Sequence, residues 1–370
     1  MKRADNLYKN LCDLDNIINM TDKVLKNTTN KNKVNDFEYH KMEHIINIKN
    51  RLDNKNFKFS KYSIFMITDP KYRIIMDINL EDKIINHLVS EYILKNTFEK
   101  KYIDSMIATR IGKGTSYGIR LLKKYLNKLK NDKFYILKLD IKKYFYSMDH
   151  DVLRKILNDN IKDKDALNIL DSIINLTNYE YINNQIIQLK ENKISNLKDI
   201  KVIKKIKEIP LYKYNKGCSI GNQTSQNFGL IYLNDFNHFL KEELHLKYVI
   251  NYMDDFIILH RDKNYLKYCF DMVEEELKKY KLELNKRKSK VFSISEGIDF
   301  LGYIFYIKNN KILIKLRNRS KYNFKVKIKN LKILREQSII NNKEYINLLS
   351  SYKGLLKYNS NLYYRSVIHD

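Results

Sequence analysis

Two stretches of the chain place their apolar residues at helical spacing. In residues 81–99 and again in residues 264–283, apolar side chains recur every three or four positions, which gathers them on one face of an α-helix. The same spacing returns from Lys321 to the end of the chain, with many basic residues between the apolar ones. We therefore predict one helix in each of the first two stretches and helices in the last.

Three shorter stretches favour strands. Residues 134–141 and 247–260 are rich in β-branched and aromatic side chains, which is typical of buried strands. A tight turn at residues 253–255 must break the second of them, because acidic residues interrupt the apolar run there. Residues 311–316, KILIKL, place apolar side chains between and after two lysines and predict another strand. The order is mixed α and β, helical at both ends with strands in the middle.

The chain holds only two prolines and nine glycines, so we expect no flexible linker and domains that share packed boundaries. Residues 23–55 are rich in Asn and Lys and could include a mobile surface loop, although Phe37 to Ile48 retains some helical periodicity. Residues 183–207 form a charged insertion to which the pattern assigns no place.

The charge of the chain indicates its partner. The sequence has 70 Lys and Arg but only 43 Asp and Glu, which gives a formal net charge of +27. A polyanionic partner is the natural interpretation, since each neutralised phosphate releases counterions. The alternative is the compositional bias of an A/T-rich genome, which enriches Lys, Asn and Ile. Bias explains abundant Lys but not the shortage of acids, so we expect a nucleic acid as the partner.

Cysteine and hydropathy patterns favour an intracellular location. Cys12, Cys218 and Cys269 lie far apart without C-x-x-C spacing, which indicates neither a disulfide framework nor a zinc site and fits a reduced cytosol. No apolar run approaches the roughly 18 residues that span a bilayer. The first residues turn polar before a signal-peptide core could form. We expect no membrane partner.

Three carboxylates stand at the ends of predicted strands. Asp140 ends one strand, and Asp254 and Asp255 lie between two short ones more than a hundred residues later. Carboxylates gathered in this way are costly unless a positive charge lies between them. Two divalent ions about 3.5–4 Å apart would supply it, and Mg²⁺ suits hard oxygen ligands and a nucleoside triphosphate. The alternative for an Asp-Asp pair alone is an ordinary turn.

The order of motifs around these carboxylates resembles that of reverse transcriptases. The five palm-like motifs are LDIKKYF at residues 139–145 with SMDH at 147–150, GCSIGNQTSQ at 217–226, YMDD at 252–255, LN and KS at 284–289, and FLGY at 300–303. Two fingers-like motifs precede them, DPKYRII at residues 69–75 and RIGKGTS at 110–116. The resemblance covers roughly residues 60–365. It implies an α+β right-hand polymerase with fingers, a palm with an antiparallel sheet, and a helical thumb.

The resemblance also implies a domain order. Residues 1–130 would form the N-terminal region and fingers, and residues 131–160 the first part of the palm. Residues 161–212 would belong to the fingers or an insertion, residues 213–310 to the second part of the palm, and residues 311–370 to the thumb. The thumb would grip a duplex through its backbone.

The catalytic assignments follow from the same motifs. Asp140, Asp254 and Asp255 would be catalytic and, with the backbone of Ile141, would bind two Mg²⁺ ions, for which Mn²⁺ is a substitute. Residues expected to bind the incoming dNTP are Arg73, Arg110, Lys113, Tyr144, Phe145, Gly221, Gln226 and Lys288. Residues expected to contact template or primer are Asn222, Ser225, Tyr252, Met253, Leu301, Gly302 and Tyr303.

Each of these assignments has a plainer alternative. Phe145 would be the steric gate that excludes the ribose 2′-hydroxyl, or simply part of the core. Asn222, Ser225 and Gln226 stand where a loop enters a helix, so they could be caps. The basic residues would clamp a triphosphate or remain solvated surface charges.

The variant Ile220-Gly221-Asn222 with Ser225-Gln226 is similar to the form found in diversity-generating retroelements and related defence-associated bacterial enzymes. The leading hypothesis is therefore a retroelement enzyme of the bacterial cytosol. It would copy an RNA template with errors at adenines, bind the RNA/DNA duplex and use a small basic accessory protein. The alternative is an antiphage defence reverse transcriptase that copies a dedicated noncoding RNA. A non-catalytic RNA-binding protein is the remaining alternative.

Overall fold

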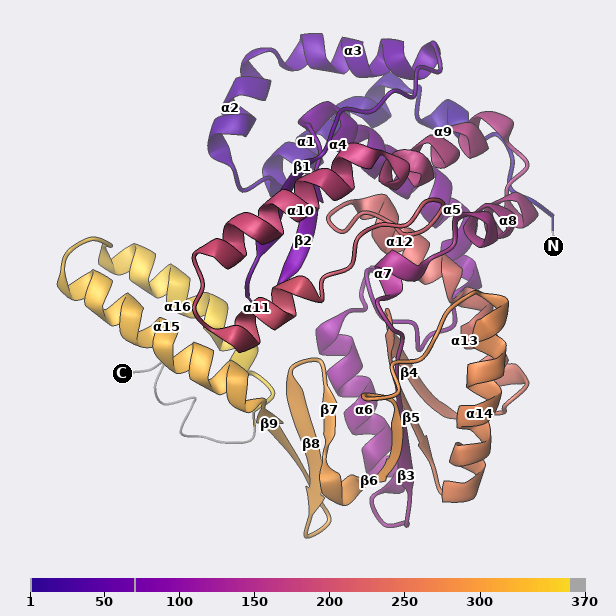
Figure 1. The fold of residues 1–370 in the computed structure, drawn as a ribbon, viewed down its shortest axis with the longest axis vertical. Coiled ribbons are helices and arrows are strands. Elements are labelled where there is room, and N and C mark those ends of the chain that lie inside the picture. The colour runs from indigo at the N-terminus through magenta and orange to yellow at the C-terminus, as the bar shows by residue number, and fades with distance from the viewer. Residues whose placement is uncertain (1, 70, 360–370) are drawn as a thin grey trace. The chain divides into compact units, whose positions relative to one another are not determined.

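The computed structural model describes residues 2–69 and 71–359. The chain divides into two compact units, each assembled from three chain segments. The first unit comprises Met1–Arg110, Ile141–Phe239 and Val273–Asn285, and the second comprises Ile111–Asp140, Leu240–Met272 and Lys286–Asp370. Figure 1 gives the elements and their order.

The first unit is mainly helical and carries one β-hairpin. Its hairpin pairs β1 (Ser63–Ile67) with β2 (Arg73–Asp77) in antiparallel register. Its helices are α1 (Leu14–Asn27), α2 (Lys31–Tyr39), α3 (Lys41–Asp53), α4 (Leu80–Leu88), α5 (Asn96–Phe98), α7 (Tyr144–Ser147), α8 (His150–Asn160), α9 (Lys164–Ile174), α10 (Glu180–Ser195), α11 (Ile200–Lys207) and α12 (Gln223–Tyr232). A π-helical stretch, Val89–Lys95, joins α4 to α5 and confirms the continuous helix expected for residues 81–99.

The second unit holds two antiparallel sheets. A four-stranded sheet has the order β4-β5-β3-β6, and a three-stranded sheet has the order β7-β8-β9. The strands are β3 (Tyr135–Asp140), β4 (Tyr248–Tyr252), β5 (Asp255–His260), β6 (Lys290–Ser293), β7 (Ile298–Phe300), β8 (Tyr303–Lys308) and β9 (Lys311–Leu316). All the strands expected from the sequence are therefore present, and the α+β class with an antiparallel sheet is confirmed.

Helices complete the second unit. They are α6 (Thr115–Leu129), which packs against β4 and β9, and the two C-terminal helices α15 (Asn318–Glu336) and α16 (Asn342–Leu356). Two further helices, α13 (Asn234–Glu242) and α14 (Lys263–Lys279), contain the points at which the chain passes from one unit to the other. The prediction of a helix to residue 283 was too long, because Lys281 has a φ of +53°, which a right-handed helix does not allow.

One expected loop is corrected, and the charged insertion receives a place. Residues 23–55 form no long loop, since the end of α1, then α2 and α3, occupy nearly all of them. The charged insertion at residues 183–207 forms most of α10, a short connection and α11. α10 packs on the hairpin, because Ile182 and Ile186 share a buried cluster with Ile74 and Met76 of β2. Periodicity was weak there because only a narrow side of α10 is buried.

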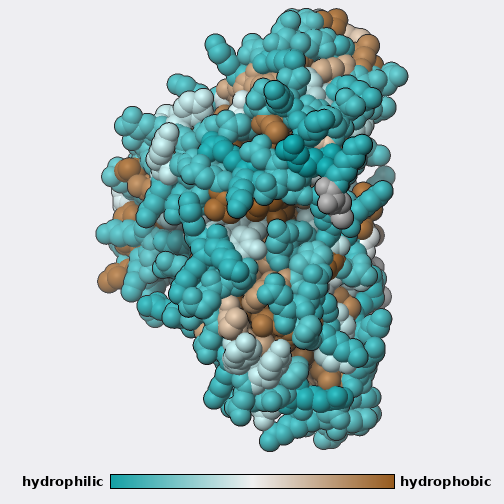
Figure 2. Space-filling model, turned by 90° about the vertical axis from the view of Figure 1, so that its right-hand side faces the viewer, coloured by the Kyte–Doolittle hydropathy of each residue, from teal (hydrophilic) through white to brown (hydrophobic). Residues whose placement is uncertain are grey.

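The surface agrees with the composition. Figure 2 shows one face that is largely hydrophilic, with small and scattered hydrophobic areas. Among the described residues, no helix is both long enough and apolar enough to cross a membrane.

Candidate active site

Asp140 and Asp255 face each other across the centre of the four-stranded sheet. β3 ends at Asp140, β5 begins at Asp255, and the two residues are direct partners in the antiparallel register. Directly opposed residues project to the same face of a sheet with Cβ atoms about 4.5–5.5 Å apart. Their neighbours Leu139 and Phe256 are fully buried, which fixes the register and therefore brings the two carboxylates together.

The turn between β4 and β5 positions Asp254 beside them. Met253 adopts a left-handed backbone with a φ of +57°, a conformation that a side chain of this size rarely takes. The buried Asn251 side chain donates a hydrogen bond from Nδ2 to the Met253 carbonyl oxygen at 2.6 Å and so holds the turn. Tyr252, the last residue of β4, pairs with Asp255. Strain at this turn thus orders the Asp254-Asp255 pair.

The Asp255 carboxyl is only partly compensated. Burial raises its pKa to about 6; Lys138 opposes the shift, and the charges of Asp254 and Asp140 add to it. The Lys138 Nζ lies 3.5 Å from Oδ1 of Asp255. That oxygen is out of contact with solvent and accepts no hydrogen bond. A buried carboxylate oxygen without a hydrogen bond favours a cation beside it.

Lys288 holds the other carboxylate. Its Nζ donates to both oxygens of Asp140, at 2.9 and 2.8 Å, and the Asp140 backbone N–H donates to the Ser289 hydroxyl at 3.0 Å. The sequence analysis assigned Lys288 to the nucleotide, and that contact stays a prediction. In this structure its ammonium neutralises Asp140.

Lys138 is a site residue that the sequence analysis missed. It contacts Asp255, and it also donates from Nζ to the backbone oxygen of Asp299 in β7 at 2.6 Å. The signal was present: a basic residue interrupts the apolar strand two positions before Asp140, which puts both side chains on one face.

The donor set fits a hard divalent cation. It consists of carboxylate oxygens, one of them buried without a hydrogen bond, with two ammonium groups as the nearest positive charges. Yet among residues 2–69 and 71–359 no three His, Cys, Asp or Glu side chains already form a group that could hold a metal ion. In this structure lysines contact two of the three carboxylates, Asp140 and Asp255, and the binding of a metal ion by Asp140, Asp254 and Asp255 together stays a prediction.

In the first unit, Gly221 fits closely against the β-hairpin. The Met76 N–H donates to the Ile220 carbonyl oxygen at 2.9 Å, and a Cβ placed on Gly221 would lie 2.6 Å from the Met76 oxygen. The φ of Gly221, +136°, also favours glycine. The loop at residues 217–222 is thereby fastened to β2, the strand that begins with the exposed Arg73.

Asn222 and Ser225 lie in a buried polar network. Asn222 donates from Nδ2 to the Tyr62 hydroxyl and to the Ser219 hydroxyl, both at 2.9 Å, and the Ser219 and Ser225 hydroxyls lie 3.1 Å apart. Asn222 stands at the start of α12, but its side chain makes no capping hydrogen bond, so the capping alternative is wrong for it. Both residues are almost fully buried; their contact with a template stays a prediction.

Tyr144 and Phe145 follow the first carboxylate motif. Tyr144 is buried and donates its hydroxyl hydrogen to the Gly229 oxygen at 2.6 Å, while Phe145 is half-buried with its ring edge-on to Tyr144. The Phe145 oxygen accepts a hydrogen bond from the Cys218 N–H at 2.7 Å. The Phe145 ring thus has a fixed position and partial exposure, and its role as a steric gate stays a prediction. Ile141, also assigned to the metal, is buried.

The expected triphosphate contacts divide into two groups. Arg110 is buried in structural contacts, with Nε on Glu99 at 2.8 Å and Nη1 on two backbone oxygens, those of Ile103 and Met106. Lys113 lies over the Tyr117 ring, 4.5 Å from its centre. Arg73 and Gln226 remain accessible, and Gln226 is half-buried on α12. The guanidinium of Arg110 therefore fastens a loop in this structure, and its triphosphate contact stays a prediction.

The β7–β8 turn carries the residues assigned to the primer. Leu301 and Gly302 have φ angles of +49° and +88°, which turn the chain sharply, and the Arg317 N–H donates to the Gly302 oxygen at 3.2 Å. Tyr303 is buried edge-on to Tyr358, with ring centres 6.2 Å apart. Lys138 donates a hydrogen bond to the Asp299 oxygen of β7 and also contacts Asp255. This one side chain therefore links the strand before the turn to the carboxylates.

One family model matches the chain. It is described as reverse transcriptase (RNA-dependent DNA polymerase), and it matches residues 61–305, which is more than half of the chain. The matched stretch contains β3 to β7 and the carboxylates at their ends. A search of curated proteins finds no match.

Three of the solved structures to which the chain is similar are telomerases. Telomerase from Candida albicans in complex with a TWJ fragment of telomeric RNA is 17% identical, with a TM-score of 0.44, and the similarity covers 85% of this chain and 59% of that chain. Apo telomerase from Candida tropicalis is 16% identical, with a TM-score of 0.44 and coverage of 85% and 62%. Its form truncated from the C-terminal domain is 16% identical, with a TM-score of 0.41 and coverage of 70% and 55%. This chain spans less than two thirds of each of these chains.

Proposed function

The chain belongs to the reverse transcriptase family, and we propose that it is an RNA-directed DNA polymerase, a nucleotidyltransferase that makes cDNA on an RNA template. One observation carries the proposal. The buried Asp255 oxygen without a hydrogen bond stands directly opposite Asp140, in a sheet where two further charges, Asp254 and Lys138, meet. Opposed buried carboxylates do not stabilise a sheet by packing, whereas a site that binds cations and phosphates requires them.

The carboxylates would hold the metal. Asp140, Asp254 and Asp255, with the carbonyl of Ile141, would bind two Mg²⁺ ions, which would activate the primer hydroxyl and stabilise the leaving oxygen. Lys288 would leave Asp140 when the site is loaded, and its ammonium would then be available to a phosphate. Lys138 would stay beside Asp255, where its charge opposes the rise in the pKa of that carboxyl that burial causes.

The remaining residues would position the substrates. Phe145 would exclude the 2′-hydroxyl, and Arg73, the accessible cation at the start of β2, would face the triphosphate. The turn at Leu301 and Gly302 would support the primer end. The duplex would be gripped by α15 and α16, which are the described helices of the proposed thumb.

We further propose that the enzyme serves a diversity-generating retroelement in a bacterial cytosol. The support is Ile220, which stands where many reverse transcriptases place Gln and offers no hydrogen bond to a nascent pair. The enzyme would then discriminate least well against mispaired nucleotides opposite adenine in the template. Sequencing cDNA made on one RNA by the wild type and by Ile220→Gln tests this role. An equal and low error rate at adenine would contradict it and favour the antiphage defence role.

Primer extension tests the activity itself. The purified chain should extend a DNA primer on an RNA template with dNTPs and Mg²⁺, more weakly or less faithfully with Mn²⁺, and not in EDTA. Tight RNA binding without extension in any of these metals would contradict the proposal and leave the non-catalytic RNA-binding protein.

A further inference from the structure

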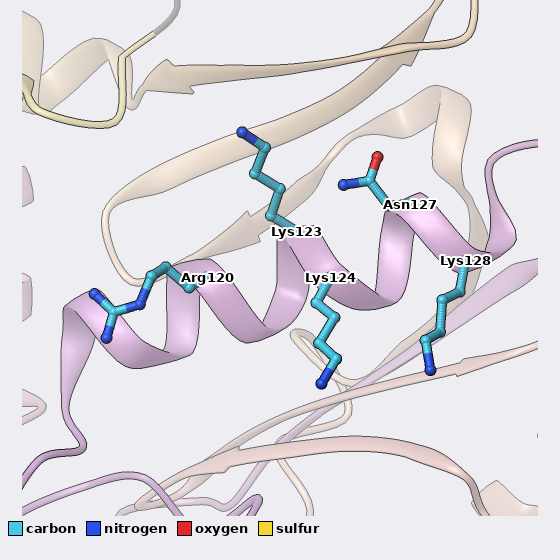
Figure 3. Close-up of a pocket in the computed structure, with 5 residues that line it drawn as sticks. All are labelled: Arg120, Lys123, Lys124, Asn127 and Lys128. Carbon is cyan, nitrogen blue, oxygen red and sulfur yellow. The ribbon is translucent and has the colours of Figure 1, made fainter.

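The helix α6 of the second unit carries a basic face. Its apolar side, including Leu122 and Leu126, is buried, and no acidic residue occurs between Thr115 and Leu129. Its outer side borders a shallow hollow of about 420 Å³, lined by Arg120, Lys123, Lys124, Asn127 and Lys128. Figure 3 shows Lys124 and Lys128 projecting side by side from one edge of α6, and Lys123 and Asn127 from the other.

These charges are not compensated by the protein. Lys123, Lys124 and Lys128 make no ion pair within residues 2–69 and 71–359, whereas many other lysines of the chain are paired with acids. The three lysines are exposed, and Lys124 and Lys128 are one helical turn apart. Repulsion between them favours an anionic partner that runs along the helix.

A second hollow continues the first. It has a volume of about 250 Å³, shares Arg120 and Lys123 with the basic face, and reaches strand β9. Its other lining residues are Ile119, Ile312, Ile314, Lys357, Tyr358 and Asn359. Its size lies just below the ~300–1,000 Å³ of common small-molecule sites, so it accommodates one ring-sized group and not a whole dinucleotide. Its floor is apolar and its rim is cationic.

Asn359 gives this hollow its chemistry. The side chain is 1% exposed, and neither its amide nitrogen nor its amide oxygen has a hydrogen-bond partner within the described residues. Leaving both groups unpaired costs free energy that a ligand with an adjacent donor and acceptor would recover. The edge of a nucleobase is such a ligand, and Asn pairs with an adenine edge in two hydrogen bonds.

The Tyr358 ring is the aromatic wall of the hollow, and two cations, Arg120 and Lys357, line the hollow beside it. An aromatic ring beside an apolar floor offers a base a surface on which to stack.

We propose that the basic face of α6 and the Asn359 hollow form a second nucleic-acid site, which takes an unpaired base into the hollow and the phosphates of the same strand along α6. A single strand is required, because a base paired in a duplex has no free edge to offer. None of the lining residues belongs to the carboxylate site, so the proposal does not rest on polymerase activity. Single-stranded RNA and single-stranded DNA both offer an unpaired base and a chain of phosphates, so both fit this site.

The basic face is tested by a charge-reversed pair of lysines with a matched control. Lys124→Glu with Lys128→Glu is compared with Lys263→Glu and Lys267→Glu, two exposed lysines with the same spacing on α14 and the same total change of charge. Binding of a fluorescein-labelled single-stranded RNA 12-mer, and of the matching DNA, is followed by anisotropy at several salt concentrations. An excess of unlabelled primer–template duplex occupies the polymerase site throughout.

We expect the α6 pair to weaken binding by at least 10-fold at low salt and to lower the slope of log affinity against log salt by about 1.4, two phosphates at ~0.7 each. The control pair should weaken binding less than 3-fold. Equal losses in the two pairs, or complete displacement of the 12-mer by the duplex, would overturn the proposal. The RNA and DNA arms decide which strand the site takes.

The hollow is tested through Asn359→Leu, with Asn359→Gln as the conservative variant. The wild type should distinguish the four homopolymeric 12-mers by at least 5-fold, and Asn359→Leu should lose that preference while keeping the salt slope. Asn359→Gln should restore part of the preference. Circular dichroism establishes that each variant is folded. Binding that is independent of base in the wild type, or equal competition by poly-glutamate, would overturn the assignment to nucleic acid.

Discussion

Asp255 is a carboxyl whose surroundings favour its neutral form. Its folded-state pKa of about 6 lies above the ordinary 3.8, chiefly because of burial. In the folded protein, ionisation of this group is therefore costly above pH 6, and the cost disappears below the unfolded pKa near 4. Lys138, at 3.5 Å, relieves only part of it.

The prediction concerns Asp255→Asn in EDTA. The variant should be more stable than the wild type at pH 8, by on the order of 2–3 kcal/mol, and this gain should shrink between pH 6 and pH 4 and vanish below. Urea unfolding across this range measures it, with the exposed Asp271→Asn as the control. Added Mg²⁺ should stabilise the wild type and cancel the gain. A pH-independent difference would contradict the assigned burial of charge.

Phe145 is the proposed steric gate against ribonucleotides. Its ring is half-buried and held by Tyr144 and by the Cys218 hydrogen bond to its own carbonyl. Phe145→Ala should raise the use of rNTPs relative to dNTPs by 10-fold or more, because the clash with the 2′-hydroxyl is removed. Single-nucleotide incorporation on a fixed template gives the ratio. An unchanged ratio would mean that the ring serves only in packing.

At the scale of elements, the loop around Gly221 depends on the β1–β2 hairpin. A Cβ at Gly221 would meet the Met76 oxygen at 2.6 Å. Gly221→Ala should therefore destabilise the protein by on the order of 1–3 kcal/mol. Gly354→Ala, within α16 and with open space around it, should be neutral or slightly stabilising. Urea midpoints measure both, and equal midpoints would contradict the close approach.

Four strands, β3, β4, β5 and β9, were predicted, because their apolar runs are short and bounded, and the turn at Met253 was visible as acidic residues inside an apolar run. Among the elements that were not predicted, α10 buries only a narrow face, and the β1–β2 hairpin is short. The end of α14 was also not predicted correctly, because the hydrophobic pattern does not show that Lys281 adopts a left-handed backbone conformation.

Among the site residues, the opposition of Asp140 and Asp255 could be expected from the motifs. Lys138 could have been found, because it lies two positions before Asp140 on the same strand. Lys288 could not be placed on Asp140, because the pattern does not say which of 70 basic residues reaches a carboxylate. The burial of Asn222 and Ser225 was equally hidden, since their partner Tyr62 is distant in sequence.

At the scale of the whole molecule, a strongly basic chain, +27 in formal charge, carries two directly opposed carboxylates, Asp140 and Asp255, at the centre of a sheet. The basic surface attracts a polyanion, and the acids would carry the reaction. These two properties are separable, because removing one carboxylate barely changes the charge that binds RNA.

Primer extension by Asp140→Asn and by Asp254→Asn tests the central claim most directly. Each variant should lose at least 1,000-fold in extension on an RNA template while binding that RNA within 3-fold of the wild type, because the metal ligand is lost and the basic surface is kept. Asp271→Asn, a matched change at an exposed position, should extend normally. Extension by either active-site variant at near the wild-type rate would contradict the account.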